Sequence, residues 1–117
     1  MVIILWRDIP AQVNAQVGRE RHQIMLSAKF QRAIDRAKRK AHIYTADEDV
    51  AQWRRLSIEF SGDVKDSAQR EADRIELEYD RRRLGLLAFA GGLEGAVQEF
   101  SVASKELAAL EELAEGE

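Results

Sequence analysis

The run Val2–Trp6 constrains the fold of this chain more than any other segment. Its five residues are all aliphatic or aromatic, with no polar residue between them, which is typical of a short strand buried on both faces. Pro10 then breaks the pattern, because proline lacks an N–H group and fixes its own φ. Residues 12–17 alternate polar and apolar up to Gly18. We therefore expect a β-hairpin with its turn around residues 8–11, or alternatively a helix that begins near Pro10.

A basic amphipathic helix is predicted next, with Ser27 as its N-cap. One apolar stripe recurs at helical spacing, formed by Phe30, Ala33, Ile34, Ala37 and Ala41. The other faces are basic and carry Lys29, Arg32, Arg36, Lys38, Arg39 and Lys40.

A short helix and a third strand are expected to follow. Thr45 and Glu48 match a capping box, which predicts a helix over residues 46–55 that buries Val50 and Trp53. Residues 56–60 alternate strictly and so predict a strand whose inward side chains are Leu56, Ile58 and Phe60.

A long, charged helix is predicted from an N-cap at Asp63 to about Leu87. Its inner face is formed by Val64, Ala68, Ala72, Ile75 and Tyr79. The pair Gly91–Gly92 indicates a boundary, so we expect one domain over residues 1–92 and a separate segment over 93–117. In that segment, heptad-like spacing links Ala96, Phe100, Ala103, Leu107, Leu110 and Ala114.

These patterns predict an α+β fold. A two- to three-stranded sheet, made of the N-terminal hairpin and a third strand, is covered by about three helices. An amphipathic C-terminal helix is added to it. That helix is too short for a stable coiled coil alone, so we expect it to dock on the domain, on a partner or on a second copy as a homodimer.

The net charge of −3 hides a segregation of charge along the chain. Residues 19–40 hold eight basic and two acidic residues, whereas residues 94–117 hold seven glutamates and one lysine. Both runs are explained by solvated helix faces or by mutual neutralisation. The alternative is that the basic run binds nucleic acid or an acidic partner, with Phe30, Tyr44 or Trp53 available for base stacking.

Most catalytic equipment is missing from the sequence. The chain has no cysteine and two histidines, His22 and His42, neither with carboxylates at ligand spacing. It lacks a Gly-x-Ser-x-Gly elbow, and Gly91–Gly95 lacks the lysine of a phosphate loop. We therefore expect no enzyme activity, cofactor or metal. No apolar run reaches the ~18 residues of a membrane span, so a cytoplasmic protein without a membrane partner is expected.

The triplet Trp6-Arg7-Asp8 before Ile9-Pro10 stands out because it places an aromatic ring, a cation and an anion at a strand end. Arg7 and Asp8 are expected to pair or cap the turn while Trp6 packs in the core. The alternative is a recognition surface at this edge. The candidate recognition residues are Trp6, Arg7, Asp8, Pro10 and Gln12, followed by the basic-helix residues Arg32, Arg36, Arg39 and Lys40.

The residues Ile3-Ile-Leu-Trp-Arg-Asp-Ile-Pro-Ala-Gln-Val13 resemble the opening of the small "virulence factor" domain family. The resemblance continues through Phe30–Ala37 and Trp53–Arg55 and covers about residues 2–92. Two departures stand out: the Gly-Arg-rich stretch after the second strand is only partly kept at residues 18–21, and the chain after Gly92 lies outside the pattern. The family occurs as stand-alone bacterial proteins and as a module of conserved virulence factor C-type proteins. No catalytic residues are established for it.

The leading functional expectation is a non-enzymatic interaction module, a small subunit or accessory of a cytoplasmic bacterial enzyme system with a protein partner. The family resemblance also implies an accessory role in corrinoid- and folate-dependent methyl transfer, with a corrinoid or methyltransferase protein as partner. Nucleic-acid binding through residues 29–40 is the remaining alternative.

Overall fold

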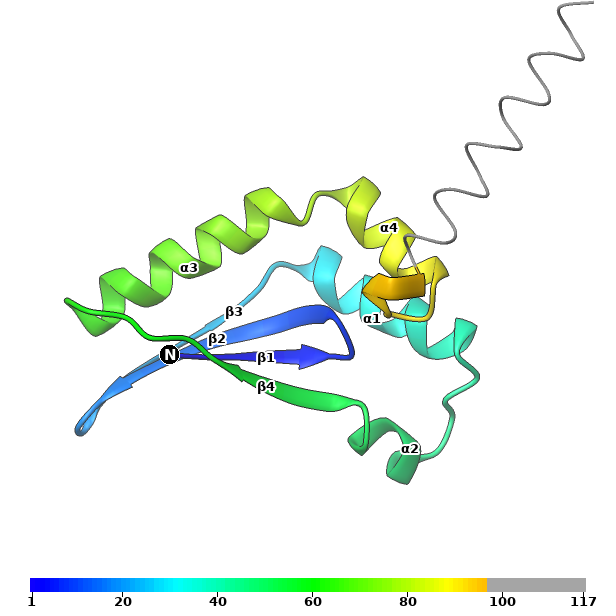
Figure 1. The fold of residues 1–117 in the computed structure, drawn as a ribbon, viewed down its shortest axis with the longest axis horizontal. Coiled ribbons are helices and arrows are strands. Elements are labelled where there is room, and N and C mark those ends of the chain that lie inside the picture. The colour runs from blue at the N-terminus through cyan, green and yellow to red at the C-terminus, as the bar shows by residue number, and fades with distance from the viewer. Residues whose placement is uncertain (97–117) are drawn as a thin grey trace, which may run out of the picture.

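The computed structural model describes residues 1–96 and has an α+β fold. Most of the segment predicted over 93–117 therefore lies outside the described residues. Figure 1 shows α1, α3 and α4 on one side of a four-stranded sheet, with α2 at the N-terminal end of β4. The strands are β1 (Val2–Trp6), β2 (Ile9–Val17), β3 (Glu20–Met25) and β4 (Trp53–Ser57), and the helices are α1 (Ala28–Lys40), α2 (Ala46–Val50), α3 (Val64–Glu78) and α4 (Arg81–Phe89).

The sheet has the order β3-β2-β1-β4, and every neighbouring pair is antiparallel. Ile3 and Leu5 of β1 are buried in the core beside Val13 of β2. Val2 and Ile4, which alternate with them, are only half-buried, since no helix covers their face of the sheet (Figure 1). β1 is thus buried mainly on the helix-covered face of the sheet and not on both faces.

The hairpin turn differs from the expected residues 8–11. β1 and β2 are joined by Arg7 and Asp8 alone, because Trp6 already pairs with Ile9. β2 continues through Pro10, and the register shifts between Ile4 and Leu5. Such a bulge tolerates proline, which cannot donate to the ladder.

β3 was not predicted, and it raises the strand count from the expected two or three to four. It pairs with β2 through a two-residue turn in which Gly18 has a φ of 60°. Its outer residues are exposed and only His22 and Ile24 are half-buried. This weak alternation at a sheet edge explains why Gly18 looked like the end of the β-structure.

The predicted 46–55 helix is wrong in its C-terminal half. Thr45 does cap α2, since its hydroxyl accepts a hydrogen bond from the Glu48 N–H at 3.2 Å, but the helix ends at Val50, which is 70% exposed. β4 starts at Trp53 and pairs with the whole of β1, with Trp53 opposite Trp6. Pairing with a central strand therefore overrides the local helical pattern.

The strand expected at 56–60 shares only its first two residues with β4. Leu56 was predicted to face inward but is 45% exposed. Ile58 and Phe60 lie beyond the strand, where they are half-buried against the core. The register set by β1 thus displaces the strand toward the N-terminus.

The helix predicted from Asp63 to Leu87 is two helices. Asp63 caps α3 as expected by accepting from the Asp66 N–H at 2.9 Å. The chain breaks at Tyr79, and Asp80 caps α4 by accepting from the Arg83 N–H at 2.8 Å. The break lets α3 pack on β2 and β3 while α4 packs on α1, as Figure 1 shows. No helix within residues 1–96 is long and apolar enough to cross a membrane.

Gly92 allows the loop after α4 to close directly over Trp6. Trp6 is fully buried, and a Cβ atom on Gly92 would lie 2.9 Å from its Cζ3 atom. Gly92 has a φ of 87°, a conformation that other residues rarely adopt. Its carbonyl accepts from the Asp8 N–H at 2.8 Å, which ties the loop to the hairpin turn.

We predict that Gly92→Ala lowers the free energy of unfolding by about 2–4 kcal/mol, because it combines positive-φ strain with a clash against Trp6. Gly62→Ala is the matched control, since Gly62 has a φ of 96° but open space around its Cβ position. This variant should lower the free energy of unfolding only by the positive-φ strain, about 1 kcal/mol. Urea unfolding followed by circular dichroism measures both, and equal losses would contradict the close packing.

Candidate functional site

Asp49 of α2 holds two tryptophans and a lysine together. Its Oδ1 atom accepts from Trp6 Nε1 at 2.8 Å and pairs with Lys38 Nζ at 2.9 Å, and its Oδ2 atom accepts from Trp53 Nε1 at 3.4 Å. The hydrogen bond from Lys38 lowers the pKa of Asp49 below its usual value, and the indole hydrogen bonds add to this against the opposing effect of burial. The carboxylate thereby joins β1, α1, α2 and β4.

Arg7 anchors the hairpin turn to two loops. Its backbone N–H donates to the Gln52 carbonyl at 2.9 Å and its Nε atom to Gln52 Oε1 at 3.0 Å. Its Nη1 atom donates to the Gly91 carbonyl at 3.0 Å. Arg7 has a φ of 51°, a strained conformation for a residue with a side chain, and these three hydrogen bonds hold it there.

Asp8 completes the anchor. Its Oδ1 atom accepts from Arg54 Nη2 at 2.8 Å, and its Oδ2 atom accepts from the Glu94 N–H at 2.7 Å. Arg54 also donates through Nε to the Arg7 carbonyl at 2.7 Å. Arg7 and Asp8 therefore connect the hairpin to β4 and to the loop after α4.

The structure separates the N-terminal candidate residues from one another. Trp6 and Pro10 are buried, so neither is part of an exposed recognition surface. Arg7 and Asp8 are half-buried and engaged in the contacts above. Gln12 lies on the uncovered sheet face, where its Oε1 atom accepts from Gln23 Nε2 at 2.7 Å.

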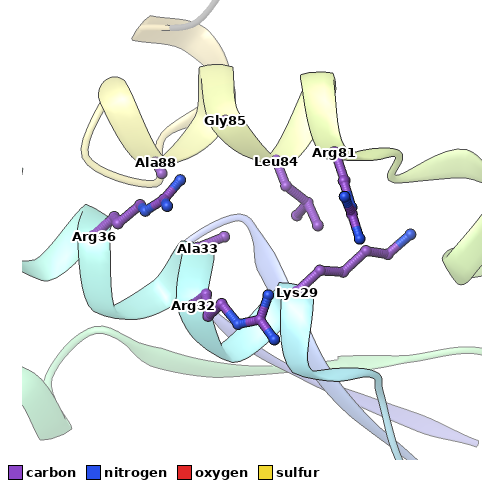
Figure 2. Close-up of a pocket in the computed structure, with 8 residues that line it drawn as sticks. All are labelled: Lys29, Arg32, Ala33, Arg36, Arg81, Leu84, Gly85 and Ala88. Carbon is purple, nitrogen blue, oxygen red and sulfur yellow. The ribbon is translucent and has the colours of Figure 1, made fainter.

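The basic-helix candidates Arg32 and Arg36, by contrast, line one groove between α1 and α4. Figure 2 shows the groove, with the long cationic side chains of α1 and Arg81 of α4 around the gap. We call it the basic groove; it is lined by Lys29, Arg32, Ala33, Arg36, Arg81, Leu84, Gly85 and Ala88. A second hollow shares Arg36, Gly85 and Ala88 with it and extends it along Arg39, Lys40, His42 and Phe89.

Most cations of the basic groove lack a carboxylate partner. Lys29 pairs with Glu76 of α3 at 3.5 Å, and Lys40 Nζ lies 4.3 Å from the centre of the Phe89 ring. Within residues 1–96, no ion pair or hydrogen bond engages the side chains of Arg32, Arg36, Arg39 and Arg81. The groove therefore presents positive charge that the described part of the chain does not neutralise.

Glu76 of α3 binds the first residues of α1. Its carboxylate accepts from the Ser27 N–H at 2.6 Å and the Ser27 hydroxyl at 2.9 Å. Burial acts to raise the pKa of Glu76, but the hydrogen bonds from Ser27 and the charge of Lys29 outweigh it and lower that pKa. The start of α1 is thus bound to α3.

A comparison with protein-family models matches residues 4–88 of the chain to the family described as "Virulence factor". No curated protein and no solved structure matches the chain. The matched residues make up most of the sequence and include the hairpin, α1 and nearly all of α4. The chain belongs to the virulence factor family.

In this virulence factor domain, the sequence did not point to α4 as part of the site. The sequence pattern predicts Arg81 and Gly85 within one long helix that reaches about Leu87. The signal that reveals their role is the cap at Asp80, because a new helix start permits a new direction. Gly85 is also unusual, since it lies inside α4 with nothing within 4 Å of its Cβ position.

The basic groove combines positive charge with apolar side chains. Its floor is formed by Ala33, Leu84 and Ala88, all buried. Within residues 1–96, no group of three or more histidine or acidic side chains is placed to hold a metal ion. The imidazole of His42 contacts the Tyr44 hydroxyl at 3.3 Å. This arrangement is suited to holding an anionic, partly apolar ligand.

We predict that Asp49→Asn lowers the free energy of unfolding at pH 7 by about 1–3 kcal/mol, because it removes the charge that Lys38 and the two indoles contact. Asp47→Asn is the control, since Asp47 lies in the same helical turn and is exposed. It should have less than half the effect.

The Asp49 effect should also depend on pH. The pKa of Asp49 is lower in the folded protein than its ordinary value of 3.8, so the carboxylate stabilises the fold fully above that value. The difference between wild type and Asp49→Asn should shrink as the pH falls below 3.8 and through the lowered folded pKa. Urea unfolding from pH 7 to pH 2.5 measures it, and a constant difference would contradict the role of the charge.

Proposed function

We propose that this virulence factor domain is a non-enzymatic interaction module of the cytoplasm, and that its basic groove binds an acidic segment of a partner protein. The observation that carries the proposal is a row of cations that have no acidic partner within residues 1–96 and lie around apolar side chains. Arg32, Arg36 and Arg81 surround the buried side chains of Leu84 and Ala88.

The geometry favours a protein segment as ligand because the groove combines two kinds of surface. Guanidinium groups pair with carboxylates in bidentate geometry, and the exposed ring of Phe89 along the extension gives apolar surface to a ligand that also carries aliphatic side chains. An acidic amphipathic segment supplies both. A groove of this kind is a common way to bind a helix of a partner.

The rigid support behind the groove suits a binding module. Ala33, Ile34 and Ala37 of α1 are buried in the core, and Lys38 holds the same helix to Asp49. The groove walls are therefore fixed by the fold, which lowers the entropic cost of binding.

Nucleic acid is the competing ligand, since exposed Tyr44 and Phe89 lie along or near the basic extension of the groove. Phosphate binding depends steeply on salt and needs no apolar floor. An accessory role in corrinoid-dependent methyl transfer, implied by the family resemblance, is one specific form of the interaction module and would be recognised from the identity of the partner.

We predict that Arg32→Glu combined with Arg36→Glu weakens binding of the partner roughly tenfold or more, because two attractions become repulsions. The control reverses two exposed arginines of the β2–β3 hairpin, Arg19→Glu with Arg21→Glu, and so changes the net charge equally. A pull-down from the native host with mass spectrometry identifies the candidate, and titration with the purified partner measures the loss.

The proposal requires a protein that the wild type and the hairpin control bind but the groove variant does not, with or without nuclease treatment. Equal binding by the wild type, the hairpin control and the groove variant would place the interface elsewhere. Capture that disappears with nuclease, together with a gel shift that weakens steeply with salt, would show a nucleic-acid binder instead.

A further inference from the structure

The charge of the chain is divided between its described part and its C-terminal segment. Residues 1–96 contain 17 basic and 15 acidic residues, a net charge of +2, whereas residues 97–117 contain six glutamates and one lysine, a net charge of −5. The unpaired cations of the basic groove thus share a chain with an excess of carboxylates.

The C-terminal segment also complements the apolar floor. Apolar residues recur every three or four positions in it, namely Phe100, Leu107 and Leu110 with alanines between them. All of its charged residues except Lys105 are glutamates. A segment with this spacing presents one apolar stripe flanked by carboxylates if it is helical. The groove presents a matching arrangement of opposite charge, in which buried Leu84 and Ala88 and the exposed ring of Phe89 lie among its cations.

The chain that follows α4 passes the C-terminal end of α1. A Cβ atom on Gly91 would lie 3.5 Å from the Cβ atom of Ala41, at the end of α1. Glu94 is held at α4 by its ion pair with Arg83 at 3.7 Å, and Arg83 does not line the groove, so the segment must pass around α4 to reach it. Twenty-one further residues span about 30 Å as a helix, whereas α1 is about 20 Å long, so the segment is long enough to follow the whole groove.

Gly85 provides room for close contact. A glycine inside a helix costs about 1 kcal/mol relative to alanine, and at this position the fold itself gives no steric reason for it, because nothing lies within 4 Å of the Cβ position. Gly85 borders both halves of the groove. An exposed backbone at this point permits an occupant to approach α4 closely.

We propose that residues 97–117 bind in the basic groove of their own chain. The inference builds on the proposed function, because an acidic partner would then have to displace this segment. A tethered segment competes at an effective concentration in the millimolar range, so the chain sets a threshold of affinity that a partner must exceed.

The cysteine-free sequence permits a direct test in the full-length protein. A nitroxide is attached to the single cysteine of Ser104→Cys, a position outside the apolar stripe. The amide signals in ¹⁵N-resolved NMR spectra are then compared between the protein with the active nitroxide and the same protein with the nitroxide reduced. We expect the signals of Arg36, Gly85 and Ala88 to broaden and that of Gly18, on the β2–β3 hairpin, to remain sharp. Adding Arg32→Glu and Arg36→Glu to the labelled chain should remove most of the broadening.

A second variant tests docking without changing the charge of the groove or destabilising the fold. Gly85→Leu fills the groove with a better helix former where space is open, so thermal stability should be kept or raised while the broadening at Arg36 and Ala88 is lost. Gly85→Ala is its smaller control and should retain most of the broadening.

Two results would overturn the inference. One is sharp groove signals in the spin-labelled ¹⁵N protein. The other is broadening of comparable strength when spin-labelled protein without ¹⁵N is mixed with ¹⁵N protein that carries no nitroxide. The second result would show that the segment binds a second copy. The pull-down with the groove variant is independent of both, so the proposed function can fail or hold separately.

Discussion

The hydrogen-bonded carboxylate of Asp49 is the contact on which the rest of the structure depends. A tryptophan as large as Trp6 can be fully buried at a strand end only if its indole N–H finds an acceptor, and Asp49 provides that acceptor while also binding Lys38. The same carboxylate fixes the end of α1 and the start of β4. Through α1 it positions one wall of the basic groove, so the core and this groove share one polar contact.

The sequence contained enough information for the α+β class, for α1 and for the caps at Thr45 and Asp63, because these features depend on neighbouring residues. It failed where distant strands compete with local pattern. Trp53 lies at helical spacing from Val50, but pairing with Trp6 across the sheet places it in β4 instead. β3 was missed because an edge strand buries little and carries charged residues that suit solvent.

The candidate site was half predictable for the same reason. Arg32, Arg36, Arg39 and Lys40 were found because a basic helix face is visible in the sequence, whereas the wall that turns this face into a groove comes from α4. The position of Arg81 follows from the break after α3, and no local pattern around Arg81 indicates that it lies opposite α1. The motif Trp6-Arg7-Asp8 shows the reverse: its conspicuous side chains are used within the fold, and the contacts of Asp8 reach residue 94.

Those contacts of Asp8 have a consequence for how the protein is made. The hairpin turn leaves the ribosome about 84 residues before Gly92, its hydrogen-bond partner, which at ~5–20 residues per second means a delay of roughly 4–17 seconds. During that time Arg7 has no Gly91 carbonyl to hold its strained backbone, and Trp6 is not yet covered. Vectorial synthesis therefore leaves an aromatic strand end exposed until the last described helix arrives, and this interval is when a chaperone would have a hydrophobic surface to bind.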